Sequence, residues 1–157
     1  MKLSELFSET FQLIGLELAP IDEKIESIEI HLTGYPILNL EKLPEEELLV
    51  ISGVFCRYMD TDNLAHIFES LLNLHAYGFY TQGAFFAANS ETEQIILHKI
   101  IPLSYLSSQE LASLITIFAQ TLNTIIESWK QGELDSLCSA YPLSLSSPLD
   151  TVNLLRI

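Results

Sequence analysis

Positive charge is scarce in this 157-residue sequence, and so are cysteine and long apolar runs. Lysine and arginine number 7 against 21 aspartate and glutamate residues, which gives a formal net charge of -14 at pH 7. A surface of this sign repels phosphate backbones and anionic lipids, so we expect neither nucleic-acid binding nor membrane insertion. The same acidity favours solubility and attracts a basic, loosely folded polypeptide.

The two cysteines have neither the spacing of a disulfide framework nor that of a metal site. Cys56 lies in an apolar run and Cys138 near the C-terminus, so we interpret both as reduced thiols of a reducing compartment. The N-terminus turns polar and acidic at Ser4 and Glu5, before the apolar segment of a signal peptide can form. No run approaches the roughly 18 apolar residues of a membrane span, so we expect a cytoplasmic protein.

Motifs of enzymatic chemistry are also missing. The six glycines form neither a phosphate-binding loop nor the elbow of a serine hydrolase. The segment from Asp60 begins like a calcium loop, but Ala65 and Leu71 stand where that loop needs glycine and glutamate. The histidines lie in different predicted elements and form no metal site: His31, His66, His75 and His98. We therefore predict no catalytic residue, metal or cofactor. An unrecognised enzyme site, whose turnover a change of His66 or Asp60 would abolish, stays as an alternative.

Apolar residues, by contrast, are abundant. They make up 48% of the chain, only 18% of residues are charged, and the mean hydropathy is +0.29. A chain of this length can bury roughly two-thirds of the surface that its unfolded form exposes, so it can form one domain with a sizeable core. The apolar excess is large for a soluble monomer, and we expect part of it to contact another protein.

Apolar periodicity predicts three helices and five strands. The helices are expected over residues 3–14, about 60–78 and 107–131, and the last one begins with a capping box formed by Ser107 and Glu110. We expect the capping side chains of the second helix to come from residues Asp60 to Asp62. The strands are expected over residues 28–32, 35–40, 48–55, 80–88 and 94–101.

The resulting order, α-β-β-β-α-β-β-α, implies one mostly antiparallel five-stranded sheet packed with three helices, which is an α+β fold. We assign this domain to residues 1–131. Residues 132–157 are rich in serine, leucine and proline and show no sustained period. We expect this tail to be extended or partly ordered.

One stretch of local pattern, together with the element order, size and acidity, resembles a known family. It runs through Leu71–Leu74, Gly83–Asn89, Ile95–Leu97, Ile101–Leu103 and Ser107–Trp129. In the class I type III secretion chaperones, a helix with a leucine-rich end leads to a strand with a small residue and a tight turn. An apolar strand closing on Pro-Leu follows, and then a last amphipathic helix with an aromatic residue near its end. The resemblance covers residues 1–131, and the longer tail departs from it.

The resemblance implies a function and two surfaces. Members of that family are homodimers that bind a segment near the N-terminus of a secreted effector and keep it ready for export, without nucleotide or metal. They belong to bacteria with a type III secretion system. By this resemblance we expect effector contacts from the first helix and strands: Leu3, Phe7, Phe11, Ile30, Leu32 and Tyr35. We expect the dimer interface from the second helix and the following strand: Phe68, Leu72, Tyr77, Phe79 and Phe85.

Two alternatives stay open on the sequence alone. The residues assigned to effector contact would equally serve to cover the sheet of their own domain. The same fold would also suit a regulatory or scaffolding domain without a secretion role, whose apolar surface binds one folded partner. Recovery of a partner only in its folded state would favour that second function.

Overall fold

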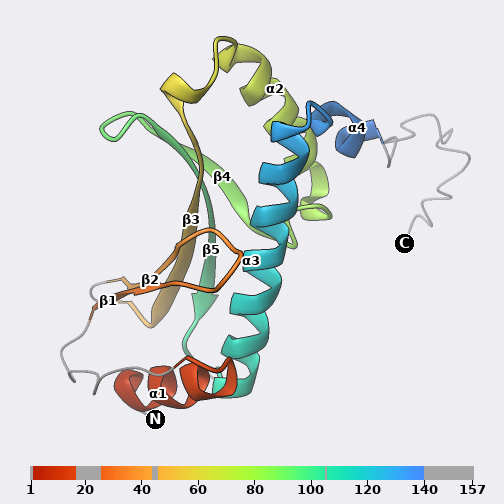
Figure 1. The fold of residues 1–157 in the computed structure, drawn as a ribbon. Helices are drawn as coiled ribbons and strands as arrows, with labels where there is room; N and C mark the ends of the chain where they lie inside the picture. Colours follow the sequence, from red (N-terminus) through yellow and green to blue (C-terminus); the bar gives the residue numbers. More distant parts are fainter. Residues whose placement is uncertain (1, 17–25, 44–45, 105, 140–157) are drawn as a thin grey trace, which may run out of the picture.

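Five strands form one antiparallel sheet in the computed structural model, which describes residues 2–16, 26–43, 46–104 and 106–139 (Figure 1). The order across the sheet is β1-β2-β3-β5-β4, so β1 and β4 are its edges. The strands are β1 (Ser27–Ile30), β2 (Leu38–Lys42), β3 (Leu48–Arg57), β4 (Phe85–Asn89) and β5 (Gln94–Pro102). The predicted α+β class and antiparallel sheet are confirmed.

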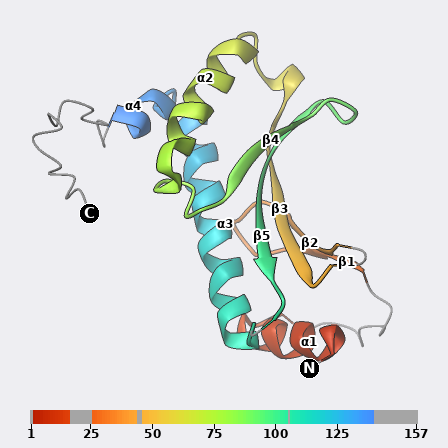
Figure 2. The ribbon, with the colours of Figure 1, turned by 180° about the vertical axis from the view of Figure 1, so that it is seen from behind.

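The main helices lie where the apolar periodicity predicts them. They are α1 (Leu3–Leu13), α2 (Leu64–His75) and α3 (Ser108–Lys130), and short 3-10 turns cover Tyr58–Asp60 and Ala76–Gly78. Helix α3 runs along one face of the sheet, α1 lies at its N-terminal end, and α2 lies at the opposite end beside β4 (Figures 1 and 2). The long helix α3 therefore connects the two ends of the molecule.

Helix α3 is the centre of the hydrophobic core. By length and composition it would be able to cross a membrane, but eight of its residues are buried against the rest of the fold. Trp129 fixes its C-terminal end, with its ring centroid 5.2 Å from that of Phe55 in β3. Gly132 follows with a positive φ of 73°, which ends the helix as predicted.

The N-terminus of α3 has the predicted capping box. The hydroxyl of Ser107 accepts a hydrogen bond from the backbone N–H of Glu110 at 3.2 Å, and the Glu110 carboxylate accepts one from the Ser107 N–H at 2.9 Å. These bonds favour the ionised carboxylate, so the hydrogen bonding from Ser107 lowers the pKa of Glu110. The helix start is thereby fixed next to α1.

A close approach between α3 and β3 depends on Gly53. A Cβ atom at this position would lie 2.4 Å from Cδ2 of Leu122 in α3 and 3.1 Å from Cδ2 of Leu38 in β2. Both leucines are fully buried and have little room to move. Glycine is therefore the residue that lets the helix pack directly on the middle of the sheet.

A β-bulge between Val54 and Cys56 interrupts the alternation of β3. Because of this bulge, Phe55 and Cys56 are both buried although they are neighbours. Burial, with a further contribution from the negative charge of Asp60, raises the pKa of the Cys56 thiol to about 11. The thiol is therefore protonated at neutral pH and unreactive, as expected for a structural cysteine. The side chain of Cys138 lies outside the described part of the structure.

Several predicted strand boundaries differ by one or two residues from the observed ones, and three boundaries are wrong because of local turns. The strand expected over 80–88 begins only at Phe85, because Gln82 and Gly83 have positive φ angles of 52° and 75° and form a turn. The second strand begins at Leu38 instead of Tyr35 and continues to Lys42. The cap of α2 is Asn63, whose Oδ1 accepts from the backbone N–H of His66 at 3.2 Å, and not the segment 60–62. In each case local turn chemistry decided a boundary that periodicity alone does not define.

The tail begins with a helix that the sequence analysis did not predict. Residues 134–139 form α4 (Leu134–Ser139), which lies against α2 and α3. Leu134 is buried there. The expectations for residues 140–157 lie outside the described residues.

Candidate protein-binding surfaces

The described residues contain no group of three or more histidine, cysteine, aspartate or glutamate side chains that could hold a metal ion. The hollows and exposed apolar side chains are the features that stand out instead. They gather at two places, one at each end of α3. We call them the α1–α3 groove and the α2–β4 face.

The α1–α3 groove consists of two adjoining hollows beside the loop that joins β5 to α3. One has a volume of about 550 Å³ and the other about 650 Å³, and both are lined by Ser104 and Leu106. The first continues along α3 and the second toward α1. Their apolar lining comes from Leu3, Leu6, Ile101, Pro102, Leu103, Leu106 and Leu114. The polar lining comes from Ser104, Ser107, Gln109 and Ser113 and from the charged residues Glu47, Glu110 and Lys42. The first hollow is mainly apolar, whereas the second is more polar than apolar.

The walls of the groove are held together by contacts between α1 and α3. The hydroxyl of Thr10 donates to the carbonyl oxygen of Ser108 at 3.3 Å, and the Ser108 hydroxyl donates to the Glu9 carboxylate at 2.9 Å. Below them, the rings of Phe7 and Phe11 are fully buried with centroids 5.7 Å apart. Helix α1, which lines one hollow, is thus fixed to the start of α3, which lines the other.

The residues assigned to effector contact occupy different places. Leu3 lines the groove. Leu32 is half-buried against the core, and Tyr35 is exposed in the turn before β2. Phe7, Phe11 and Ile30 are buried in the core of this chain, where a ligand would reach them only if α1 moved. An amphipathic helix has the same sequence pattern whether its apolar face packs on its own domain or on a partner.

The α2–β4 face is the exposed apolar surface at the other end of the molecule. A hollow of about 180 Å³ lies between α2 and β4, and its lining includes Phe68, Leu72, His75 and Phe86. Leu72 protrudes beside this hollow with 71% of its surface exposed. Of the residues expected at a dimer interface, Phe68 is half-buried, whereas Leu72, Phe79 and Phe85 are exposed. The side chain of Tyr77 lies outside the described side chains.

The apolar surface continues from β4 onto the side of the sheet opposite α3. Phe85 of β4 pairs with His98 of β5, and exposed Val54 and Ile100 lie on β3 and β5. Strand alternation places Ile96, His98 and Ile100 on this same side. Toward β1 the side becomes polar, with Glu29 on β1 and Asn39 and Glu41 on β2. The apolar half of the open sheet is therefore the half that adjoins α2.

Two histidines flank Phe85 on the α2–β4 face. The ring centroid of Phe85 is 5.0 Å from that of His75 and 6.1 Å from that of His98. The Nδ1 atom of each imidazole is buried and has no hydrogen-bond partner among the described residues. Burial, and secondarily the charge of His75, lowers the pKa of His98 below its ordinary value of 6.5. No feature of the sequence had singled out this pair.

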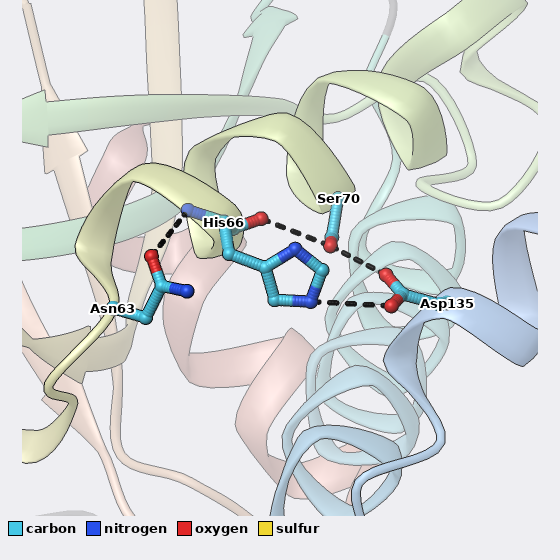
Figure 3. Close-up of polar contacts among 4 residues, drawn as sticks. All are labelled: Asn63, His66, Ser70 and Asp135. Carbon is cyan, nitrogen blue, oxygen red and sulfur yellow. Dashed lines mark hydrogen bonds and ion pairs between the residues drawn. The ribbon is translucent and has the colours of Figure 1, made fainter.

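The opposite side of α2 is covered by α4. Figure 3 shows His66 and Ser70, one turn apart on α2, both pointing at the carboxylate of Asp135. The Ser70 hydroxyl lies 2.6 Å from Oδ1 of Asp135, and His66 Nε2 lies 3.1 Å from Oδ2. Helix α4 thus covers one side of α2 and leaves the side that carries Phe68 and Leu72 open.

The chain was compared with known proteins. Among solved structures it is similar to the type III secretion chaperone SycH of Yersinia pestis in complex with a fragment of YscM2, with 16% identity and a TM-score of 0.55 over 77% of this chain and 97% of that chain. It is also similar to a chain of the ExoU–SpcU heterodimer from the type III secretion system of Pseudomonas aeruginosa. The identity is 15% and the TM-score 0.58, over 76% of this chain and 93% of that chain. A third similar structure is the HopA1–SchA chaperone–effector complex, with 13% identity and a TM-score of 0.57 over 81% of this chain and 91% of that chain.

These structural likenesses show a shared fold. No sequence among the curated proteins is significantly similar to this chain. The sequence model of the Tir chaperone protein (CesT) family matches residues 7–125, which include most of α1, the whole sheet, α2 and most of α3. The chain therefore belongs to the Tir chaperone protein (CesT) family, and it is a chaperone of type III secretion and not an enzyme.

Proposed function

We propose that this chain acts in the bacterial cytoplasm as a homodimer that holds an extended segment near the N-terminus of one or more secreted effectors and keeps it ready for export. The observation that carries the proposal is the α1–α3 groove, whose two open hollows are lined by apolar side chains of α1, β5 and α3 together with polar ones. Solved relatives named as chaperone–effector complexes support it.

The chemistry of the groove defines the segment that it would bind. In an extended chain every second side chain points to the same side. Leucine- or isoleucine-like residues at alternate positions would therefore reach the apolar walls. The carboxylates of Glu47 and Glu110 and the net charge of -14 favour lysine or arginine near these positions. We therefore expect a segment with alternating apolar residues and a positive charge.

The edge strand β1 offers such a segment a second mode of attachment. It pairs only with β2 among the described strands, so its other side has backbone groups for an added strand. Main-chain hydrogen bonds at such an edge give affinity without demanding a particular sequence. Together with the groove, this edge would suit a chaperone that serves more than one effector.

The α2–β4 face supports the homodimer. Leu72 protrudes beside a hollow formed by residues of the same surface, so a two-fold axis would place each Leu72 against the hollow of the partner copy. Aromatic residues are enriched in interface cores, and this face carries Phe68 and Phe85. Helix α4 covers the other side of α2, so the side that carries Leu72 is the one left open to a second copy.

A charge placed in the groove is expected to weaken effector binding. Leu114 lines the groove, and Leu114→Glu would add a carboxylate to an apolar wall, so we expect the dissociation constant for a captured effector segment to rise at least about tenfold. Fluorescence anisotropy with the labelled segment measures this change, and circular dichroism checks the fold.

The matched control is Ile117→Glu, because Ile117 lies on the same helix, is exposed and does not line the groove. It is expected to bind the segment like the unchanged protein. Equal binding by both variants, or equal loss by both, would remove the groove from the proposal.

A further inference from the structure

The two histidines of the α2–β4 face have an arrangement that packing alone does not explain. Buried polar atoms nearly always have a hydrogen-bond partner, yet the Nδ1 atoms of His75 and His98 have none among the described residues. A neutral imidazole with its proton on Nε2 leaves only a lone pair unpaired at Nδ1. Protonation would add a buried N–H and a positive charge at the same atom, which costs more.

The described neighbours of the two rings carry no negative charge in any contact that involves these rings. From β4 they face the ring of Phe85, and from β3 the residue opposite His98 is the uncharged Ser52. The charged group on the adjacent position of β5 is Lys99, which points to the other side of the sheet, where its ammonium donates to the carbonyl oxygen of Gln82 at 2.6 Å. The charge that acts on His98, besides its burial, is that of His75.

We propose that His75 and His98 make self-association through the α2–β4 face sensitive to acid, so that the homodimer dissociates as the imidazoles take up protons. This inference rests on the dimer of the proposed function. A second copy on this face would remove water from the exposed edges of both rings, so the dimer binds protons at these sites less readily than the monomer does. The association is therefore strongest while the rings are neutral, and it weakens as the pH falls through the pKa of His98 in the monomer, which burial already holds below the ordinary 6.5.

A dimer that weakens at low pH is the opposite of what the net charge of the chain would produce. Each protomer has a net charge of -14, so two protomers repel one another. Acidification protonates carboxylates, reduces that repulsion and would by itself strengthen the dimer. Weakening on acidification therefore requires groups that lose their neutral form in the same pH range, and histidines are those groups.

The test is the dimer dissociation constant of the full chain between pH 7.5 and pH 5.5, measured by sedimentation equilibrium at constant ionic strength. We expect a rise of roughly tenfold or more, since a shift of one pKa unit corresponds to a factor of ten. The double variant His75→Asn with His98→Asn is expected to lose this pH dependence, whatever its affinity at pH 7.5. His31→Asn, a change in the exposed loop after β1, is expected to keep it.

The outcomes distinguish this inference from the function on which it rests. A dimer at pH 7.5 whose dissociation constant stays constant or falls at pH 5.5 overturns the acid response and leaves the chaperone dimer standing. A double variant that is as pH-dependent as the unchanged chain also overturns it. A monomer at every pH overturns the proposed dimer and this inference together. Far-UV circular dichroism at pH 5.5 shows whether a loss of association is accompanied by unfolding.

Discussion

Gly53→Val is expected to lower the free energy of unfolding by about 1–3 kcal/mol, the usual cost of adding bulk to a packed core. The reason is steric, because a Cβ at this position would lie 2.4 Å from Cδ2 of the buried Leu122. Valine is otherwise a better strand former than glycine, so without the clash the change would stabilise β3. A loss of stability would therefore show the close packing against Leu122, whereas a gain would show that this packing is absent. Urea unfolding followed by circular dichroism measures the change.

The neighbouring residue provides the control. Ser52→Val makes a similar change on the side of the sheet that α3 does not cover, and it is expected to keep or raise the unfolding midpoint. Combining Gly53→Val with Leu122→Ala removes the side chain that the valine meets, so the two changes should destabilise the fold by less than the sum of their separate effects. Equal stability of Gly53→Val and the unchanged chain would mean that α3 does not pack on β3 as closely as described.

Leu72→Glu is expected to raise the dimer dissociation constant at least about 100-fold at pH 7.5. Burying a leucine contributes roughly 1.5–3 kcal/mol, and an isologous interface contains the residue twice. Each new carboxylate would also have to leave water within an apolar face. Because Leu72 is 71% exposed in the protomer, the change should leave the stability of the monomer nearly unaltered. Light scattering after size exclusion separates the two species.

Leu13→Glu is the matched control for this change. Leu13 is also an exposed leucine on a helix, but it lies on α1 at the other end of the molecule from α2 (Figure 1). Dimers should persist in this variant at the concentration where Leu72→Glu is monomeric. If the Leu72→Glu protein remains dimeric, the interface lies elsewhere and the α2–β4 face has another role.

Much of the fold was predictable because its signals are local and periodic. The stripe of α3, its capping box at Ser107 and its end at Gly132 all follow from residues within a few positions of one another. The α4 helix was missed because six residues are too short to establish a period, and its stability comes from contacts with α2. The only sequence trace of it is the pair Leu134 and Leu137, three residues apart.

The surfaces were less predictable than the elements. The aromatic residues Phe7 and Phe11 had the pattern of an exposed binding face, but α3 covers them, and this partner is about a hundred residues away in the sequence. The α1–α3 groove depends on Leu106, which lines one hollow together with Leu3 and the other together with Leu114 only after the chain has folded. The exposed positions Leu72 and Phe85 did coincide with the prediction, and whether they form a dimer interface stays a prediction.

The central claim is that the chain holds an extended, N-terminal segment of secreted proteins. The most direct measurement is capture of complexes from the source cytoplasm with the intact chain, followed by limited proteolysis and mass spectrometry of the protected client fragment. We predict one or a few secreted proteins, each protected over a stretch near its N-terminus that has alternating apolar residues and a positive charge. Recovery of folded cytoplasmic partners alone, or of clients protected only as complete folded domains, would contradict the account.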